Sequence, residues 1–353
     1  MPMLALAGGT SPSLGRAILT AVLADQRLSS WDMVILSRST RLPTWLRAVD
    51  GENKRHTIKA VDYTSVNSIA TALKGVHTLI SVTSAQDGSQ AQMQINLLHA
   101  AVKMGCKRFA PSQWGFGPRG WADVTSMQWV NQGVHEECIR HRDVIEFANF
   151  NQGSFMNYIG HGMFVGTEPA TDEGKNLAQL QKGSGYTPGE DEACQGLHRQ
   201  GPLGDGSGGY LIGLHNGIAE LPVREDGQWP RITFTALRDV GRFVAASLRL
   251  PRWEEDMSMV GETLTMGELL AHAQAVTGKD FKVQKVKRED IEKQMASLSH
   301  DDFMGLLWAD FNLAYVRDRE GEVVLQPVVN TLCPEVKPMG VREYMETFWA
   351  DKQ

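Results

Sequence analysis

The sequence has no strong excess of charge of either sign. Its 35 Lys and Arg residues stand against 41 Asp and Glu residues, which gives a formal net charge of −6 at pH 7. The basic side chains are scattered along the chain and form no dense tract. Nucleic acids and anionic membrane surfaces are bound through concentrated positive charge. The sequence therefore predicts no nucleic-acid partner and no membrane partner.

Cysteine is scarce, and no run of apolar residues is long enough to cross a membrane. The four cysteines, Cys106, Cys138, Cys194 and Cys333, are far apart and form no C-x-x-C pair. The histidines have no spacing typical of metal sites, such as H-E-x-x-H. The apolar first residues lack the basic flank of a signal peptide. These absences predict reduced thiols, a cytoplasmic protein and no metal site.

Residues 4–18 have the pattern of a buried strand, a turn rich in glycine and hydroxyl groups, and the start of a helix. Such a turn directs backbone N–H groups and the positive end of the helix dipole towards one point, where a pyrophosphate can bind. The usual glycine spacing is incomplete, because Pro12 stands at the middle position between Gly9 and Gly15. An ordinary strand-to-helix turn is the alternative. The candidate phosphate-binding residues are Gly8, Thr10, Ser11, Ser13, Leu14 and Gly15.

Strand and helix signals alternate through the first 150 residues. We expect strands at 3–7, 32–37, 56–61, 77–82 and 107–110 and helices at 15–28, 65–74 and 87–104. A helix at 134–143 and a strand at 144–150 follow. This alternation predicts an α/β fold of the Rossmann type, with a doubly wound parallel sheet.

The chain is long enough for a second, smaller lobe. We expect a cofactor-binding domain over 1–155 and a C-terminal α/β substrate-binding lobe over 156–353, with some segments returning to the first sheet. Few apolar residues recur between 166 and 209, which predicts a flexible insertion, either a surface loop or a lid. The expected later elements are a strand near 232–235, a strand at 281–286 and helices at 237–249, 265–277 and 288–297.

Several segments, in this order and spacing, resemble the NmrA-like and isoflavone-reductase-like group of atypical short-chain dehydrogenases. They are Gly8-Gly9-Thr10 with Leu14-Gly15, Leu36-Ser37-Arg38, Val61-Asp62-Tyr63, residues 75–81, Phe109-Ala110-Pro111-Ser112-Gln113-Trp114-Gly115, Gly153-Ser154-Phe155-Met156, residues 237–242 and residues 261–265. The resemblance implies a Rossmann domain that binds a nicotinamide cofactor. It further implies that Ser81, Val82, Pro111, Ser112, Gln113, Gly153 and Phe155 line the cofactor.

The residues after the second expected strand favour NADP(H) over NAD(H). An acidic residue there would bind the ribose 2′-hydroxyl, whereas this chain has Arg38, Ser39 and Arg41. Guanidinium groups match the charge and the geometry of a 2′-phosphate. The alternative is that the two arginines are solvated surface. Asp62 ends the third strand, and we interpret it as a turn residue or a residue on the adenine side.

The expected catalytic residues of related enzymes are missing. No tyrosine is followed four residues later by a lysine, and no lysine lies between Lys107 and Lys175. Asn131, or Gln132 in a register shifted by one, stands where the resemblance implies a lysine. An amide donates hydrogen bonds but relays no proton at neutral pH. Three alternatives remain: an iminium substrate that needs no protein acid, another donor such as His135, His161 or Tyr158, or cofactor binding without turnover.

The sequence thus predicts an NADPH-dependent reductase of a mid-sized apolar or aromatic substrate. The resemblance implies a reducible group that is an imine or iminium, an enone or a carbonyl, and a place in secondary metabolism, and reduction can be coupled to cyclisation or rearrangement. Trp114, Met156 and Tyr158 are candidate substrate contacts, although apolar residues at such positions are also common in the core. A redox-sensing regulator that binds NADP(H) without turnover is the alternative function. We expect a monomer or a homodimer.

Overall fold

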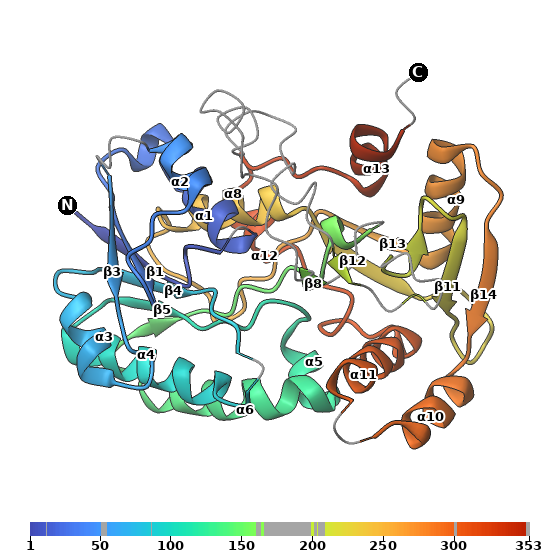
Figure 1. Cartoon of the computed structure of the whole chain (residues 1–353), viewed down its shortest axis with the longest axis horizontal. Helices are drawn as coiled ribbons and strands as arrows, with labels where there is room; N and C mark the ends of the chain where they lie inside the picture. The colour runs from blue at the N-terminus through green and yellow to red at the C-terminus, as the bar shows by residue number, and fades with distance from the viewer. Residues whose placement is uncertain are drawn as a thin grey trace.

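The computed structural model describes residues 1–11, 13–50, 55–85, 87–159, 164–165, 199–200, 203, 209–299 and 302–350. A six-stranded parallel sheet forms its first half, in the order β3-β2-β1-β4-β5-β6 (Figure 1). The strands are β1 (Met3–Ala7), β2 (Asp32–Ser37), β3 (His56–Ala60), β4 (Thr78–Ser81), β5 (Arg108–Ala110) and β6 (Glu146–Phe147). The strand order reverses between β1 and β4, so the expected doubly wound Rossmann-type sheet is confirmed.

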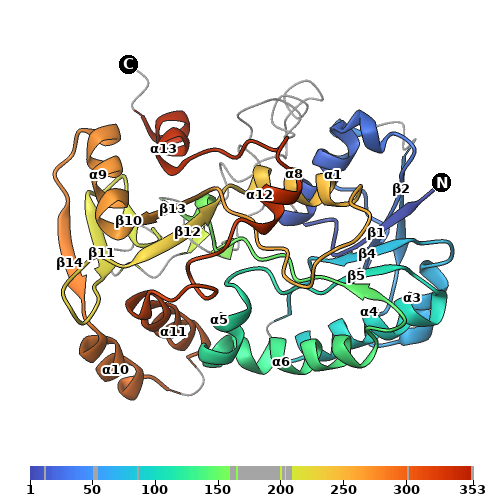
Figure 2. The same ribbon diagram turned by 180° about the vertical axis from the view of Figure 1, so that it is seen from behind.

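Helices cover both faces of this sheet, which is why its central strand is apolar throughout. Leu4 and Leu6 of β1 face one core with α1 (Leu14–Ala24) and α8 (Leu237–Ser247). Ala5 and Ala7 face the opposite core. That second face is covered by α3 (Val66–Ala72), α4 (Gln90–Met104) and α6 (Thr125–Arg140), as both views show (Figures 1 and 2).

The helix α8 lies far along the chain from α1 but packs directly against it. A Cβ atom built on Gly241 of α8 would lie 2.2 Å from the carbonyl oxygen of Ala17 in α1. Only glycine allows the two helix backbones to approach this closely. The C-terminal half of the chain therefore returns to cover the first sheet.

The second half contains two small sheets around a separate apolar core. In one, β12 (Arg231–Thr235) pairs in parallel with β7 (Ser154–Phe155) and antiparallel with β13 (Glu262–Thr265). The other consists of β10 (Ile212–Gly213), β11 (Ile218–Pro222) and β14 (Lys282–Val286). The other elements are α2 (Thr44–Val49), α5 (Pro118–Asp123), β8 (Phe164–Val165), β9 (Arg199–Gln200), α9 (Met266–Thr277), α10 (Arg288–Ser297), α11 (Phe303–Arg317), α12 (Val328–Leu332), α13 (Val341–Trp349) and two 3-10 turns, η1 (Gln26–Leu28) and η2 (Met156–Tyr158).

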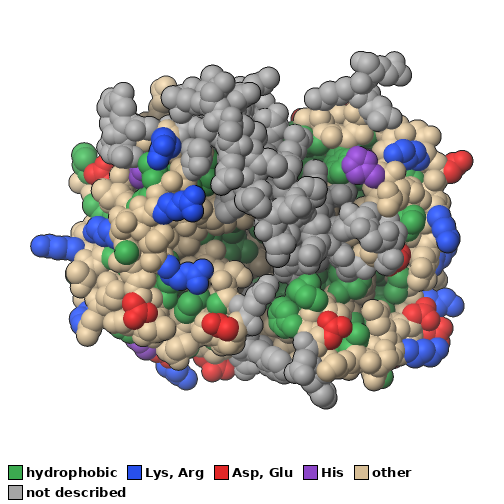
Figure 3. Space-filling view, in the orientation of Figure 1, with side chains coloured by type: hydrophobic (Ala, Val, Ile, Leu, Met, Phe, Trp, Pro, Cys, Tyr) green, Lys and Arg blue, Asp and Glu red, His purple; other side chains and the backbone are tan. Residues whose placement is uncertain are grey.

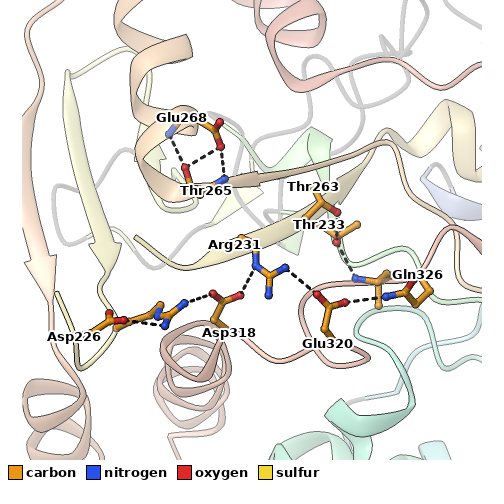
Figure 4. Close-up of polar contacts among 11 residues, drawn as sticks. Asp226, Arg231, Thr233, Thr263, Thr265, Glu268, Asp318, Glu320 and Gln326 are labelled. Carbon is orange, nitrogen blue, oxygen red and sulfur yellow. Dashed lines mark hydrogen bonds and ion pairs between the residues drawn. The ribbon is translucent and has the colours of Figure 1, made fainter. Parts of the chain in front are cut away.

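A chain of ion pairs connects α11 to the sheet around β12 (Figure 4). The carboxylate of Asp318, only 3% exposed, accepts hydrogen bonds from Arg224 at 2.9 Å and from Arg231 at 3.0 Å. Arg231 also pairs with Glu320 at 2.8 Å, and Glu320 accepts a hydrogen bond from Gln326 at 2.9 Å. Because the shared carboxylate is buried between two guanidinium groups, this network positions the C-terminal end of α11.

Several predicted elements differ from the observed ones. The helix predicted at 15–28 ends at Ala24, and Asp25 then caps the 3-10 turn η1 through the backbone N–H of Arg27. The helix predicted at 134–143 begins earlier, at Thr125, and the strand predicted at 144–150 is reduced to β6. The long helix α11 was missed, because its buried residues are spread around the helix axis and do not form a single apolar stripe.

Three cysteines, Cys106, Cys138 and Cys333, are buried free thiols, as expected, while Cys194 lies outside the described residues. The predicted insertion at 166–209 also lies outside them, apart from 199–200, 203 and 209. In the ranges given above, no helix combines the length and the apolar character needed to cross a bilayer.

Candidate functional site

The glycine-containing turn after β1 lies at the point where the strand order reverses, the position at which open α/β sheets bind ligands. Gly8 has a φ of +77°. Its N–H contacts the carbonyl oxygen of Leu36 at 3.0 Å and the hydroxyl oxygen of Tyr63 at 3.1 Å. The Tyr63 hydroxyl in turn donates to the same Leu36 carbonyl at 2.8 Å. Tyr63 therefore joins the turn to the carboxyl end of β2.

The start of α1 packs directly on this turn. A Cβ atom on Gly15 would lie 2.8 Å from the carbonyl oxygen of Gly9, so a larger residue would push the helix away. The N-cap residue Ser13 makes no side-chain hydrogen bond to the helix within the described residues. The N–H of Arg16 donates to the Ser11 carbonyl at 3.0 Å, whereas no hydrogen bond from the N–H groups of Leu14 and Gly15 is found among the described residues, so these two N–H groups are available to an anion.

Hydroxyl groups surround this helix start. The Oγ atoms of Ser11 and Ser13 are 3.0 Å apart, and Thr10 Oγ1 lies 3.4 Å from Ser37 Oγ at the end of β2. Leu14 is buried in the core beneath α1. Pro12, which stands at the position of the middle glycine, lies outside the described residues.

The side chains that follow β2 point into solvent. Arg38, Ser39 and Arg41 are exposed. Within the described ranges, neither Arg38 nor Arg41 makes a hydrogen bond or an ion pair through its guanidinium group. Two cations without partners thus lie just beyond the carboxyl end of the strand next to the glycine turn.

Asp62 at the end of β3 belongs to a local turn. Its Oδ1 accepts hydrogen bonds from the backbone N–H of Thr64 at 2.9 Å and from the Thr64 hydroxyl at 2.7 Å. These hydrogen bonds lower the pKa of the Asp62 carboxyl. The carboxylate is therefore used to shape the turn before α3.

A buried glutamine that the sequence analysis missed connects the loops after β4 and β5. Gln94 of α4 is 0% exposed; its side-chain oxygen accepts from the Ser112 N–H at 2.9 Å and its Nε2 donates to Thr83 Oγ1 at 2.7 Å. Ser81 Oγ lies 3.0 Å from Thr83 Oγ1, and Trp114 Nε1 donates to the Ser81 carbonyl at 2.9 Å. The signal in the sequence was that Gln90 and Gln94 recur one turn apart; both are buried in α4, as is Asn96.

The side chain of Gln113 contacts the backbone of Asn131 next to this junction. Gln113 donates from Nε2 to the backbone carbonyl of Asn131 in α6 at 2.9 Å. The Gln113 Oε1 atom is buried and has no partner in the described part of the chain. Asn131 is only 5% exposed, and no hydrogen bond to its carboxamide is found among the described residues. Gln132 is the next residue of α6, but its side chain is not among those that the structure describes.

The other proposed catalytic residues are placed differently. His135 lies 3.5 Å from Glu255 and packs its ring edge-on to Phe147 of β6, with 5.9 Å between the ring centroids. His161 lies outside the described residues. Tyr158 contacts the rings of Phe155 and Tyr210, at centroid distances of 5.4 and 5.6 Å. The structure therefore brings Asn131, and not His135, to Gln113.

The remaining predicted cofactor residues lie along the same edge of the sheet. Val82 continues β4 by donating to the Ala7 carbonyl at 2.8 Å, and Pro111 is buried directly after β5. Gly153 donates to the Gly115 carbonyl at 2.9 Å, next to the half-buried Phe155 of β7. These contacts bring the ends of β4, β5 and β7 together.

The three candidate substrate residues have different surroundings. Trp114 is half-buried and stacks on Phe150, with centroids 5.7 Å apart and planes 10° from parallel. Tyr158 is also half-buried. Met156 is 0% exposed and lies within the second core, where it presents no surface to a ligand in this structure. Figure 3 shows a hollow with hydrophobic side chains at its base, near the middle of the face that it draws.

Replacing Tyr63 with phenylalanine should change how stability depends on pH. Burial raises the pKa of Tyr63 from 10.0 to about 12. Between these values the unfolded chain binds fewer protons than the folded one, so stability falls as pH rises. Two pKa units correspond to about 2–3 kcal/mol. The unfolding free energy of Tyr63→Phe should therefore decline less steeply than that of the wild type between these pH values, as urea titrations would measure.

Measurements of both proteins below pH 9 are the control for this comparison. There the phenol is protonated in both states, and the variant should be less stable by a constant amount, about 1–2 kcal/mol for the lost hydrogen bonds. Parallel stability curves from pH 10 to 12 would contradict this account of Tyr63.

Comparison with known proteins identifies the sheet and its glycine turn. Residues 5–151 match the model of the NmrA-like family. This range contains β1 from Ala5 onward and the other five strands of the parallel sheet. Residues 5–151 of this chain are thus similar to the NmrA-like family. The resemblance expected from the sequence is therefore confirmed, and the candidate site lies at the carboxyl edge of the NmrA-like sheet.

Two curated fungal proteins are similar over most of the chain. One, "Oxidoreductase BOA1" of Botryotinia fuckeliana, is 25% identical over 286 residues, which cover 80% of this chain and 78% of that protein. The other, "Oxidoreductase swnN" of Metarhizium robertsii, is 24% identical over 375 aligned positions, covering 100% of this chain and 99% of that protein. Similarity thus continues beyond the NmrA-like half into the second lobe.

A solved structure has the same fold over nearly the whole chain. The structure described as "AtPrR2 with NADP+ and (+)pinoresinol" superposes with a TM-score of 0.68, covers 98% of both chains and is 17% identical in sequence. At this identity the likeness establishes the fold alone.

Proposed function

We propose that this protein is an NADP(H)-dependent reductase that uses the carboxyl edge of the parallel sheet as its cofactor site. The observation that carries the proposal is the pair of exposed arginines, Arg38 and Arg41, which make no hydrogen bond or ion pair with the described residues and lie next to a glycine turn at the start of α1. A structural neighbour solved with NADP+ and two relatives named as oxidoreductases support it.

The chain offers a separate group for each part of the cofactor. The open N–H groups of α1 and the hydroxyls of Ser11 and Ser13 suit a pyrophosphate. Arg38, Ser39 and Arg41 suit a 2′-phosphate, because guanidinium groups pair with phosphate oxygens in a planar geometry. Ser81, Ser112 and Trp114, held together through Gln94, would form the wall beside the nicotinamide.

The bound cofactor would supply a hydride, and the protein residues would orient the substrate that accepts it. Asn131 and Gln113 are neutral amides, so they can hold a substrate oxygen or nitrogen by hydrogen bonding but cannot relay a proton. This favours a substrate that is already electrophilic, such as an iminium ion, over one that needs an acid. Enones and carbonyl compounds remain within the proposed class.

The substrate would lie between the cofactor-binding domain, residues 1–155, and the lobe formed by residues 156–353. Trp114 and Tyr158 are half-buried aromatic residues there, which suits a mid-sized apolar or aromatic compound of secondary metabolism. Coupled cyclisation or rearrangement is part of this proposal. The buried reduced thiols are consistent with the cytoplasm as the site of action.

Hydride transfer from labelled cofactor tests the proposal directly. We would bind NADPH carrying deuterium at nicotinamide C4 and add a panel of cyclic iminium ions, aromatic enones and ketones. Deuterium in the product, together with loss of the reduced nicotinamide absorbance, would support a reductase. Equal affinity for NADPH and NADP+ with no deuterium transfer to any class would favour the regulator.

A regulator also requires a surface for a partner protein. The large apolar side chains exposed in the described part of the chain are Met1, Val144, Val283, Phe303, Met304 and Leu332. They belong to separate elements, and only Phe303 and Met304 are neighbours in the sequence. The described surface thus offers little support for an apolar docking patch.

Replacing Asn131 with alanine should lower kcat about three- to tenfold, the effect of losing one neutral hydrogen bond to the substrate. The cofactor should bind with unchanged affinity, because Gln113 contacts the backbone carbonyl of residue 131, which the substitution retains. Steady-state kinetics and a fluorescence titration with NADPH would measure the two effects. An unchanged kcat would remove Asn131 from the site.

A further inference from the structure

Three potential metal ligands meet between two helices on the outer surface of the parallel sheet. His99 comes from α4, Glu137 from α6, and His141 is the residue at which α6 ends. His99 Nε2 lies 2.8 Å from Glu137 Oε1, and His141 Nδ1 lies 3.6 Å from the same oxygen. One ligand atom from each residue lies within 4.8 Å of the other two. The sequence pattern predicted no metal site, because His99 and Glu137 are 38 residues apart.

We propose that His99, Glu137 and His141 form a binding site for a divalent transition-metal ion, Zn²⁺ or a cation of similar coordination chemistry, which joins α4 to α6. Imidazole nitrogen and carboxylate oxygen are ligands that Zn²⁺ accepts, and two histidines with one glutamate leave a fourth tetrahedral position for water. The set would disfavour Mg²⁺ and Ca²⁺, which prefer oxygen ligands only.

The surroundings suit coordination by a single carboxylate oxygen. Arg140 pairs with Glu137 Oε2, which leaves Oε1 on the side of the two histidines. The two imidazole rings have centroids 5.4 Å apart and planes inclined by 52°, and His141 Nδ1 also lies 3.0 Å from the backbone carbonyl oxygen of Glu137, so Nε2 is the nitrogen of His141 left for an ion. Because Arg140 already holds the carboxylate, Glu137 would be oriented before a metal ion arrives.

The charge state of the cluster is also favourable. The hydrogen bond from His99 is the largest influence that lowers the pKa of Glu137, so this carboxyl is ionised near neutral pH. Exposed fractions of 39%, 14% and 26% for the His99, Glu137 and His141 side chains leave a path for the ion and for water. A metal ion between these side chains would take the place of the hydrogen bond between His99 and Glu137.

The location gives the site a structural consequence. Gln94, which connects the loops after β4 and β5, precedes His99 on α4, and Asn131 precedes Glu137 on α6. Both helices run from the candidate cofactor site to the opposite edge of the sheet. A metal ion between their far ends would fix the relative position of the two helices that carry these residues.

Titration of the full-length protein with Zn²⁺ tests the site, after treatment with a chelator and without cofactor. We expect one Zn²⁺ per chain by calorimetry, a rise in Tm with Zn²⁺, and visible absorption bands of tetrahedral Co²⁺ when Co²⁺ is used instead. His99→Gln should keep a hydrogen bond to Glu137 but lose the imidazole ligand. Its Zn²⁺ affinity should fall about tenfold or more, and the Co²⁺ bands should disappear.

His272→Gln is the matched control. His272 lies four residues after Glu268 on α9 and interacts with it electrostatically, but the described residues provide no third ligand there. This variant should bind Zn²⁺ like the wild type. Absence of Zn²⁺ binding by the wild type, equal binding by His99→Gln, or equal losses in His99→Gln and His272→Gln would each overturn the proposal. None of these results depends on whether the protein is a reductase.

Discussion

Replacing Arg38 with alanine is expected to weaken NADPH binding about ten- to hundredfold and to leave NADH binding within about a factor of two. A hydrogen bond to a charged group contributes about 1.5–3 kcal/mol, which corresponds to this range of affinity. NADH has a 2′-hydroxyl in place of the phosphate and gains little from the guanidinium group. The guanidinium group of Arg38 makes no hydrogen bond or ion pair among the described residues, so the substitution removes only its charge, which acts on Asp87 and Tyr63.

Arg252→Ala is the control for this experiment, since Arg252 is also exposed but lies in the loop after α8. It should change neither affinity. Fluorescence titrations of both cofactors at two salt concentrations would separate a local phosphate contact from general charge attraction, which salt screens. An equal loss of NADPH and NADH affinity in Arg38→Ala would remove the basis for the cofactor assignment.

Replacing Gly241 with alanine is expected to destabilise the protein by about 3 kcal/mol and to lower its Tm by several degrees. The new Cβ atom would lie 2.2 Å from the oxygen and 2.5 Å from the carbon of the Ala17 carbonyl. Both are backbone atoms in the middle of α1, so no side-chain rotation relieves the overlap. The helix α8 must move away from α1, and this opens the core that lies beneath both.

Gly133→Ala on α6 provides a control with the opposite sign. Nothing lies within 4 Å of a Cβ atom at Gly133, and alanine is favoured over glycine in a helix by about 0.5–1 kcal/mol. This variant should be slightly more stable than the wild type. If calorimetric scans give the same Tm for Gly241→Ala and Gly133→Ala, the close approach of α8 to α1 is not a source of stability.

Much of the first half could be predicted because its signals are local. The strands predicted at 3–7 and 32–37 match β1 and β2 at both ends, since an apolar run between turn residues is enough to define a strand buried on both faces. The glycine-containing turn after β1 could also be predicted from neighbouring residues alone. The second half was harder, because a strand as short as β7 exists only through pairing with the distant strand β12.

The candidate catalytic residues illustrate the same division. The resemblance indicated that residue 131 or 132 occupies the position of a lysine in related enzymes, but the sequence left His135, His161 and Tyr158 open as alternative donors. Pairing of His135 with Glu255 and Phe147 depends on how α6 packs, which no local pattern contains. Gln94 was missed for the converse reason, because its two partners belong to other loops.

The sequence by itself determined the parallel sheet, the turn after β1 and the two arginines beyond β2, because hydrophobic periodicity, glycine spacing and side-chain charge act over a few neighbouring residues. Tertiary structure alone decided that Gln113 contacts Asn131, that Gly241 lies against Ala17 and that His99 meets Glu137. Those contacts join residues that are 18 or more positions apart. Their geometry follows from the packing of helices on the sheet, which becomes defined only when the whole core is assembled.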